Sequence, residues 1–359
     1  MSQNLPQIHL YVNQSSGQTM SPGEFHTITD ALKALDSLAP LSAEDAQLYA
    51  GEKSFPAPFF QCAPAIIHIG SGTYREKLVI QRPRITLIGE DDTRIVYGQG
   101  AYELLDTGEK RGTFRTASVR IDAPDFTAVN ITFQNDAGYG HTVGQALALY
   151  VDADRCTFDH CRLLGSQDTL FTAPLPLKEA QPGGFKGPGE YTARVLGRHY
   201  YKDCFIQGDV DFIFGSATAW FENCELFSKL PGDRLPPESP DDQVIYGYVT
   251  AASTYRENPY GYVFHKCRLT SDCPPHTIYL GRPWREYAKT VFLECEMGEH
   301  IHPAGWMDWG KPHGHFYYGE YHSTGAGAAA AERADFSHQL TDEEAEQYKI
   351  EQVLGKWVL

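Results

Sequence analysis

Two stretches of the chain, FDHCRLLGSQDTLF (158–171) and YKDCFIQGDVDFIF (201–214), carry the pattern that decides the fold. In both, an aromatic residue stands three positions before a cysteine, and a glycine, an aspartate and a phenylalanine follow the cysteine at the same spacings. Such self-similarity is typical of a solenoid, in which each repeat forms one coil. Equivalent residues of stacked coils then lie in rows, about 4.8 Å apart.

The spacing from aromatic residue to cysteine occurs in five copies along the middle of the chain. The pairs are Phe158 with Cys161, Tyr201 with Cys204, Phe221 with Cys224, Phe264 with Cys267, and Phe292 with Cys295. We expect an earlier, degenerate copy at Phe133 with Asp136. The cysteines are separated by 43, 20, 43 and 28 residues, so loops are inserted between some of the copies.

Short segments rich in β-branched and aromatic residues, bounded by Gly, Asn, Asp or Pro, surround these copies and are typical of strands. The clearest are 66–69, 85–89, 119–121, 129–133 and 291–293. Small apolar cysteines suit an internal row because free thiols bury well. The repeat therefore predicts an all-β solenoid with reduced cysteines in its core.

Both ends of the predicted solenoid carry helix signals. Thr27 with Asp30 forms a weak capping box, and the apolar residues that follow share one helical face: Ile28, Ala31, Leu32 and Leu35. Thr341 followed by Glu344 marks a helix start near the C-terminus. Because the open ends of a solenoid core need a cover, we expect both helices to be caps.

The chain shows no linker, and we predict a single domain over residues 1–359. Stretches rich in Gly, Pro and polar residues near 172–198 and 229–242 are expected to be loop excursions from the coil. Either excursion can wall a cleft. The segment 40–62 has no clean period and receives no assignment.

The formal charge of −16 argues against nucleic acid and anionic membrane surfaces as partners, because attraction to phosphate needs a basic patch. No run approaches the roughly 20 apolar residues of a membrane span. The start of the chain lacks the basic and apolar regions of a signal peptide. We therefore expect a cytoplasmic monomer as written, or a secreted one if a leader was removed.

Neither a metal site nor a cofactor is expected. The 8 cysteines show neither a Cys-x-x-Cys pair nor the dense spacing of a disulfide framework. The 14 histidines are scattered, and the close pairs His300 with His302 and His313 with His315 lack a convincing third ligand.

Aligning the two opening stretches on their cysteines places Asp168 opposite Asp211. If 172–198 loops out, the two coils are stacked neighbours and the carboxylates lie close together. Two such carboxylates cannot both ionise easily, so one becomes an acid and the other a base or nucleophile, as hydrolysis of an ester requires. The repeat alone leaves open a second interpretation, in which both aspartates are turn residues of a polar ladder.

At these residues the sequence resembles the pectin methylesterases, which release methanol from methylated polygalacturonate. The segments that match, in the family's order, are GQALAL (144–149), GSQDTLF (165–171), VDFIFG (210–215) and LGRPW (280–284). Supporting matches are GTYREKL (72–78), NITFQNDAG (130–138) and the tail QLTDEEAEQY…VLGKW (339–357). The resemblance implies a right-handed parallel β-helix, here with short capping helices at its ends.

The resemblance also implies roles for the residues of these motifs. Asp211 is expected to be the nucleophile that attacks the C6 carboxymethyl carbon and forms an anhydride. Asp168 is expected to protonate methanol and then to activate water. Gln145 and Gln167 are expected to donate to the developing oxyanion, and Arg282 to keep Asp211 ionised and oriented.

Trp284, Phe214 and Val210 are expected to line the substrate site, since flat apolar faces fit sugar rings. Each role has a structural rival: the glutamines could form an amide ladder, the arginine a structural ion pair, and the aromatic residues could only pack. The 43 residues between Asp168 and Asp211 exceed the single coil usual in the family. That length leaves the cleft walls in doubt.

Other functions remain open from the sequence. They are an esterase or thioesterase with a different acyl substrate, a lyase or glycosidase on the same fold, and a β-helix that binds saccharide without catalysis. The acidic charge further predicts that highly methylated substrate binds better than sparsely methylated substrate, and that salt weakens this preference.

Overall fold

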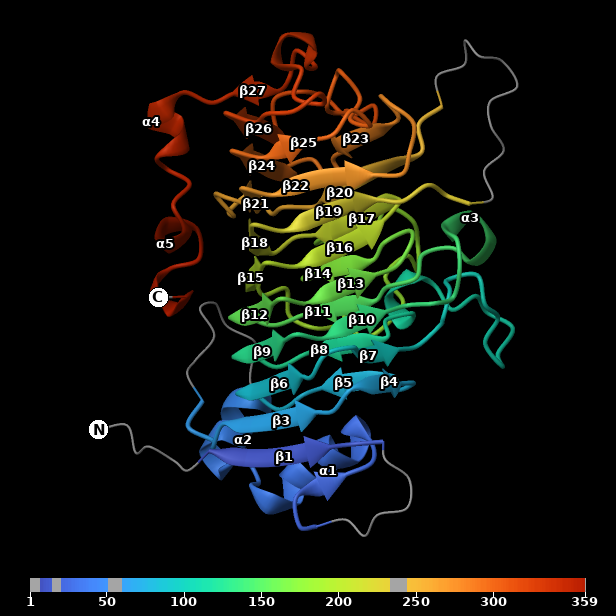
Figure 1. The fold of residues 1–359 in the computed structure, drawn as a ribbon, viewed down its shortest axis with the longest axis vertical. Helices are drawn as coiled ribbons and strands as arrows, with labels where there is room; N and C mark the ends of the chain where they lie inside the picture. Colours follow the sequence, from blue (N-terminus) through green and yellow to red (C-terminus); the bar gives the residue numbers. More distant parts are fainter. Residues whose placement is uncertain (1–6, 15–20, 51–59, 233–243, 359) are drawn as a thin grey trace.

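The computed structural model describes residues 7–14, 21–50, 60–232 and 244–358, in which the strands form three all-parallel sheets (Figure 1). The first sheet contains, in spatial order, β2 (Glu24–Phe25), β1 (Ile8–Val12), β3 (Ala65–Ile69), β6 (Ile85–Gly89), β9 (Phe126–Val129), β12 (Cys156–Asp159), β15 (Arg198–Lys202), β18 (Thr218–Glu222), β21 (Tyr262–His265), β24 (Lys289–Leu293), β26 (Tyr317–Tyr321) and β27 (His338–Gln339). The second contains β25 (Glu296–Met297), β22 (Arg268–Ser271), β19 (Glu225–Ser228), β16 (Phe205–Gly208), β13 (Arg162–Leu164), β10 (Thr132–Gln134), β7 (Thr93–Val96) and β4 (Gly72–Tyr74). The third contains β23 (Ile278–Gly281), β20 (Gly247–Ala252), β17 (Val210–Gly215), β14 (Leu170–Thr172), β11 (Leu149–Val151), β8 (Val119–Ile121) and β5 (Leu78–Ile80).

Each full coil gives one strand to each sheet in turn, and the chain forms the predicted right-handed parallel β-helix. Rows of equivalent side chains fill the interior. Phe158 stacks on Tyr201 with ring centroids 4.9 Å apart, and the row continues through Phe221, Phe264 and Phe292. All eight cysteines are free thiols, as predicted.

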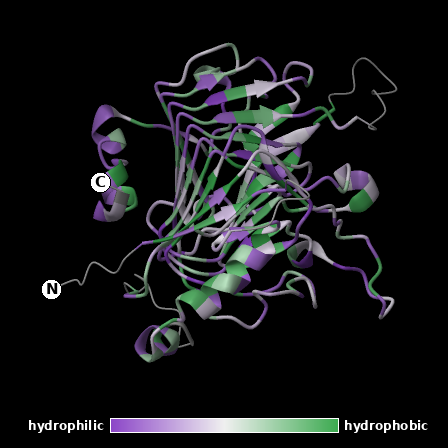
Figure 2. Ribbon diagram, turned by 60° about the horizontal axis from the view of Figure 1, so that its bottom comes forward, coloured by the Kyte–Doolittle hydropathy of each residue, from purple (hydrophilic) through white to green (hydrophobic). Residues whose placement is uncertain are grey.

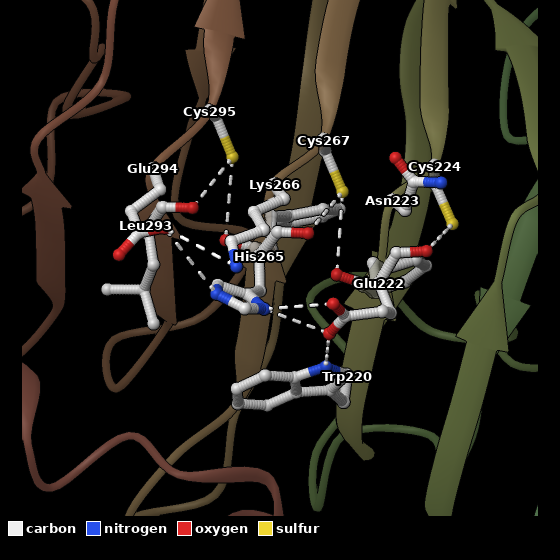
Figure 3. A network of polar contacts seen from close by, with 12 residues as sticks. Trp220, Glu222, Asn223, Cys224, His265, Lys266, Cys267, Leu293, Glu294 and Cys295 are labelled. Carbon is white, nitrogen blue, oxygen red and sulfur yellow. Dashed lines mark hydrogen bonds and ion pairs between the residues drawn. The ribbon is translucent and has the colours of Figure 1, made fainter.

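A second row, of cysteines, follows the aromatic row around the corner between the first and second sheets. Figure 3 shows three of its thiols, Cys224, Cys267 and Cys295, directed at backbone oxygen atoms. The residue before each cysteine has a left-handed backbone, with φ between 50° and 53°: His160, Asp203, Asn223, Lys266 and Glu294. This conformation turns the chain from one sheet into the next within a single residue.

The predicted degenerate copy at Phe133 with Asp136 is wrong. The register of β12 with β9 places Ala128 opposite Phe158, so Ala128 and Ile131 take the aromatic and cysteine positions in that coil. Phe133 lies one element later, in β10 of the second sheet. The search for an aromatic residue missed this copy of the repeat, because Ala128 stands where the other coils have an aromatic ring.

The predicted strand 129–133 is also divided. Asn130 has φ 55° and ends β9, and β10 begins at Thr132. The other predicted strands lie within β3, β6, β8 and β24. The left-handed Asn130 therefore forms a corner between two strands, which the apolar residues on both sides of it made look like one strand.

Helix α1 (Ile28–Leu38) covers the N-terminal end of the core, as predicted. Thr27 is its N-cap and accepts a hydrogen bond from the Asp30 amide, and Ile28, Ala31 and Leu35 are fully buried. Figure 2, which turns this end forward, shows α1 lying across it. Helix α2 (Ala43–Ala50) lies in the segment that received no assignment, of which 51–59 is outside the described residues.

The C-terminal tail takes a different place from the expected cap. Its helices are α4 (Asp342–Ala345) and α5 (Ile350–Val353), and α4 begins after Thr341 as predicted, where Thr341 and Glu344 form a capping box. The helices run beside the first sheet (Figure 1), where α5 contacts β18. Outward-facing apolar side chains of that sheet attract them: Trp220, Val263, Val291 and Leu293 pack with Leu340, Val353 and Leu354.

The shorter elements lie in the connections. They are α3 (Gly140–Val143) and the 3₁₀ turns η1 (Thr113–Arg115), η2 (Ala330–Glu332) and η3 (Lys356–Val358). Residues 173–197, between β14 and β15, form no helix or strand, and Phe185 packs in an apolar cluster outside the third sheet. Of the second expected excursion, 233–242 lies outside the described residues. Among the residues described, no helix has the length and apolar character needed to cross a membrane.

Candidate active site

Asp168 and Asp211 occupy equivalent places on stacked coils. In the third sheet Leu170 pairs with Ile213, so the aspartates two positions before them share one register. The Asp168 amide donates to the Val210 carbonyl at 3.0 Å. The insertion of 173–197 loops out and leaves the coils adjacent, as the alignment on cysteines predicts.

The backbone is unusual at both aspartates. Asp168 has φ 64° and Asp211 has φ 53°. At Asp211 the register of β17 with β20 shifts between Val210 and Ile213, a β-bulge that re-aims the side chain. Left-handed residues other than glycine are uncommon, and strained backbone of this kind collects at functional sites.

Arg282 holds the Asp211 carboxylate with two hydrogen bonds. Its Nε donates to Oδ1 at 2.8 Å and its terminal nitrogen donates to Oδ2 at 2.7 Å. The guanidinium also contacts two aromatic rings, with its Cζ 3.9 Å from the Tyr248 centroid and 3.8 Å from that of Trp309. This bidentate pair fixes both partners more firmly than a single contact.

Asp168 lacks such a partner. It is 7% exposed, and its side chain forms no ion pair or hydrogen bond with the rest of the described chain. Burial raises the pKa of Asp168 well above the usual range, the charge of Asp211 raises it further, and Arg282 opposes the rise. Burial also raises the pKa of Asp211, but the hydrogen bonds and charge of Arg282 counteract it. Only Asp211 has a cation bound to it, so the proton is favoured on Asp168 rather than on Asp211.

Gln145 and Gln167 lie on neighbouring coils near the aspartates. The Gln167 carbonyl accepts from the Ala146 amide at 3.1 Å, and the Gln145 carbonyl accepts from the Ala101 amide at 2.9 Å. Gln167 packs against Gly140 of α3, where a Cβ atom would lie 2.6 Å from the glutamine side chain. Both glutamines are partly exposed, and their amide groups form no hydrogen bond within the described chain. They are free to donate to a ligand.

The three residues expected to line the substrate site differ in exposure. Trp284 and Val210 are partly exposed. Phe214 is 3% exposed and packs edge to face with Trp284, with centroids 5.6 Å apart. Phe214 therefore supports the tryptophan from below, whereas Trp284 presents the accessible surface.

Sequence reasoning did not find Tyr248, Trp309 and Lys311. Tyr248 comes from β20, and the other two come from the loop between β25 and β26. Trp309 has φ 54° and is 37% exposed, an unusual state for so large an apolar residue. The sequence GWMDWG (305–310) could have predicted an exposed turn near the site, since its glycine and aspartate residues around two tryptophans are typical of a turn.

Among the described residues, one group of His, Cys, Asp or Glu side chains is close enough to hold a metal ion: Asp159, His160 and Asp203. This group lies at the corner between the first and second sheets and includes none of the predicted site residues.

Comparison with known proteins identifies the family. The pectinesterase family model matches residues 56–175 and 191–356 and omits the middle of the 173–197 excursion. Pectinesterase 31 of Arabidopsis thaliana is 33% identical over 306 residues, which are 80% of this chain and 82% of that protein. Pectin methylesterase PemA from Erwinia chrysanthemi is 30% identical with a TM-score of 0.73, over 97% of each chain. The pectin methylesterase from carrot is 27% identical with a TM-score of 0.73, over 100% of this chain and 96% of that one. The chain therefore belongs to the pectinesterase family, whose members are carboxylic ester hydrolases.

Proposed function

We propose that this protein hydrolyses the C6 methyl esters of methylated polygalacturonate or oligogalacturonides, with Asp211 as nucleophile and Asp168 as general acid and base. One observation carries the proposal: two register-equivalent buried carboxylates, of which only Asp211 is bound by a cation. The family supports the ester substrate. A solved pectin methylesterase, 29% identical with a TM-score of 0.72, is in complex with a hexasaccharide, which supports a saccharide chain as ligand.

In the first half of the reaction, an Asp211 oxygen attacks the C6 carbonyl carbon of the ester. The negative charge moves from Asp211 to the carbonyl oxygen, where the Gln145 and Gln167 amides can donate, an arrangement that contributes a few kcal/mol per donor. The bond from C6 to the methoxy oxygen breaks, and the Asp168 proton passes to methanol. An acyl anhydride on Asp211 and an ionised Asp168 remain.

In the second half, Asp168 takes a proton from water and the hydroxyl attacks the C6 carbon of the anhydride. The bond from C6 to the Asp211 oxygen breaks. The hydroxyl becomes part of a carboxylic acid on the sugar, which releases its proton to bulk water. A free carboxylate on the sugar, an ionised Asp211 and a protonated Asp168 result. The original protonation states return without any outside group, and Arg282 stabilises the Asp211 carboxylate as leaving group.

Methanol release from methylated oligogalacturonides tests this function. Asp211→Asn keeps the shape of the side chain and tolerates the left-handed backbone, but removes the nucleophile. We expect its turnover to fall to background while far-UV circular dichroism stays unchanged. Asp203→Asn is the matched control, because Asp203 is another left-handed aspartate, outside the site, with φ 51°.

Two outcomes would contradict the proposal. Turnover by Asp211→Asn close to that of the parent would exclude this nucleophile. Binding of pectin by the parent without methanol release would favour a saccharide-binding β-helix, and turnover of other acyl esters in its place would favour a paralogous esterase.

A further inference from the structure

The segment 176–190 lies between the two stretches that the pectinesterase family model matches, yet it packs against the candidate site. It belongs to the 173–197 excursion between β14 and β15. Its turn is held by Glu179, whose carboxylate accepts hydrogen bonds from the backbone amides of Gly183 and Phe185, both at 2.9 Å. Because these bonds fix the backbone at Phe185, the segment presents that side chain in one direction.

Phe185 is 5% exposed and packs against aromatic residues from other parts of the chain. Its ring meets Phe114 of η1 edge to face, with centroids 6.0 Å apart. It also meets Trp284 edge to face, with centroids 6.4 Å apart. Such contacts between rings are favourable beyond the area that they bury. A phenylalanine buried by other coils therefore anchors the segment to the site.

Polar contacts fasten the same segment on both sides of its phenylalanine. Lys186 Nζ donates to the Glu109 carboxylate at 3.0 Å, which connects the segment to the loop before η1. The Arg285 guanidinium donates to the Lys178 carbonyl at 3.3 Å, and its Cζ lies 4.6 Å from the Trp284 ring centroid. The segment therefore joins the loop before η1 to the loop between β23 and β24, which carries the tryptophan.

Trp284 is partly exposed and lies at the edge of this aromatic cluster. Three phenylalanine rings surround its indole, with centroids at 5.6 Å for Phe214, 6.4 Å for Phe114 and 6.4 Å for Phe185. Phe114 and Trp284 come from stretches that the family model matches, whereas Phe185 does not. The segment 176–190 thus adds one ring to the packing that limits how the indole can move.

This packing bears on binding rather than on the bond-making step. An aromatic side chain binds a sugar ring through its accessible face, so the orientation of the indole decides how well it stacks. A side chain that is already held in its bound position loses less entropy when the ligand arrives, and this gain appears as affinity. Among the described residues, the ring contacts of Phe185 are with other rings and with Arg285, and not with the two aspartates of the site.

Resting on the proposed function, we propose that Phe185 is a positioning residue, which holds Trp284 in the orientation that stacks on a sugar ring of the oligogalacturonide. It acts on substrate binding and leaves the chemical step unchanged. The segment 176–190 gives this chain a more rigid saccharide platform than the stretches matched by the family model provide by themselves.

The test is a double-mutant cycle between Phe185→Ala and Trp284→Ala, measured by methanol release from a methylated hexagalacturonate. We expect Phe185→Ala to raise KM about fivefold and to change kcat less than about twofold. In the Trp284→Ala background the same substitution should have no further effect on KM, because the residue that it positions is absent. Leu177→Ala is the matched control, since Leu177 belongs to the same segment but is 69% exposed, and it should behave as the parent.

Three outcomes would overturn the assignment: a fall in kcat with unchanged KM, a Phe185→Ala variant that matches the parent, or the same rise in KM with and without Trp284. If Phe185→Ala has lost its cooperative thermal unfolding, Phe185→Leu, which keeps most of the volume, enters the same cycle. Its rise in KM should be about twofold and should again vanish without Trp284.

Calorimetric binding of the hexagalacturonate separates this inference from the proposed function. If the parent bound the oligomer but released no methanol, the proposed function would fail. A loss of affinity in Phe185→Ala that is absent in the Trp284→Ala background would then still support the positioning role, and a loss of equal size in both backgrounds would exclude it.

Discussion

Two corners of the same coil use left-handed residues for different ends. At the corner between the first and second sheets, left-handed residues precede the cysteine row, and most are exposed: His160, Asn223, Lys266 and Glu294. At the corner between the second and third sheets, Asp168 and Asp211 have the same backbone but are 7% exposed. A left-handed backbone alone therefore indicates only a corner of the coil. Two buried carboxyl groups on adjacent coils at such a corner indicate a candidate catalytic site.

The polar groups at the first corner are satisfied by their neighbours. His265 lies between two acidic side chains, 2.9 Å from Glu222 and 4.0 Å from Glu294, and Trp220 donates to Glu222 at 2.7 Å (Figure 3). At the second corner Asp168 has no such partner among the described residues. The paired side chains at the first corner can contribute to stability, whereas the unpaired Asp168 carboxyl group at the second corner can react with a ligand.

The largest expected effect that separates the corners comes from Asp168→Asn. Loss of the proposed general acid and base should lower kcat about 10²- to 10⁴-fold. Asp203→Asn, at the first corner, should change kcat less than about twofold. Steady-state methanol release measures both. Comparable losses in the two variants would mean that the buried corner has no special role.

Arg282→Lys is expected to have the next largest effect. Lysine keeps the charge but loses the bidentate geometry and the stacking between Tyr248 and Trp309. We expect about a hundredfold fall in kcat/KM. Lys289→Arg, a substitution between the same residue types outside the site, is the control.

The pH profile gives the sign for Arg282. The proposed mechanism needs Asp211 ionised and Asp168 protonated, so the parental rate should rise through the pKa of Asp211 and fall through that of Asp168. Since Arg282 counteracts the raised pKa of Asp211, weakening the pair should move the acidic limb to higher pH. A rate profile of kcat/KM against pH that keeps its acidic limb in Arg282→Lys would contradict the proposed role of the pair.

The sequence predicted the corner that holds Asp168 and Asp211 better than the residues around it. Cysteine spacing is set by the coil, so the alignment of Asp168 with Asp211 survived a 25-residue insertion between β14 and β15. Arg282 came from the family motif. The sequence did not predict that Trp309 and Lys311 lie near the site. They belong to a loop of a later coil, and no periodic pattern in the sequence determines where such a loop lies. The predicted position of the C-terminal tail was wrong for a related reason. The tail packs on the apolar outer face of the first sheet, and that face forms only when strands from different coils lie in register.

At the first corner, a smaller effect on stability is expected. Burial alone would raise the pKa of Glu222, but hydrogen bonds from His265 and Trp220 outweigh it and hold the pKa below the usual range. A carboxylate whose pKa is lower in the folded state stabilises the fold above the unfolded pKa, near 4.5, and this contribution is lost as pH falls through the folded value. Glu222→Gln should therefore lower Tm near pH 7 by about 2 °C and by less at pH 3. Thermal unfolding at both pH values checks this, and an equal loss at the two would exclude the ionic contribution.

The smallest effect concerns charge over the whole molecule. A net charge of −16 repels sparsely methylated oligomers over distances that salt screens, with a Debye length of about 8 Å at 0.15 M. Raising the salt from about 0.02 M to 0.15 M should therefore lower KM for sparsely methylated oligomers about twofold and leave KM for fully methylated ones unchanged. A KM that rises with salt for the sparsely methylated oligomer would contradict this. It would show that attraction by positive charge beside Asp211, such as that of Arg282, outweighs repulsion by the acidic surface even at long range.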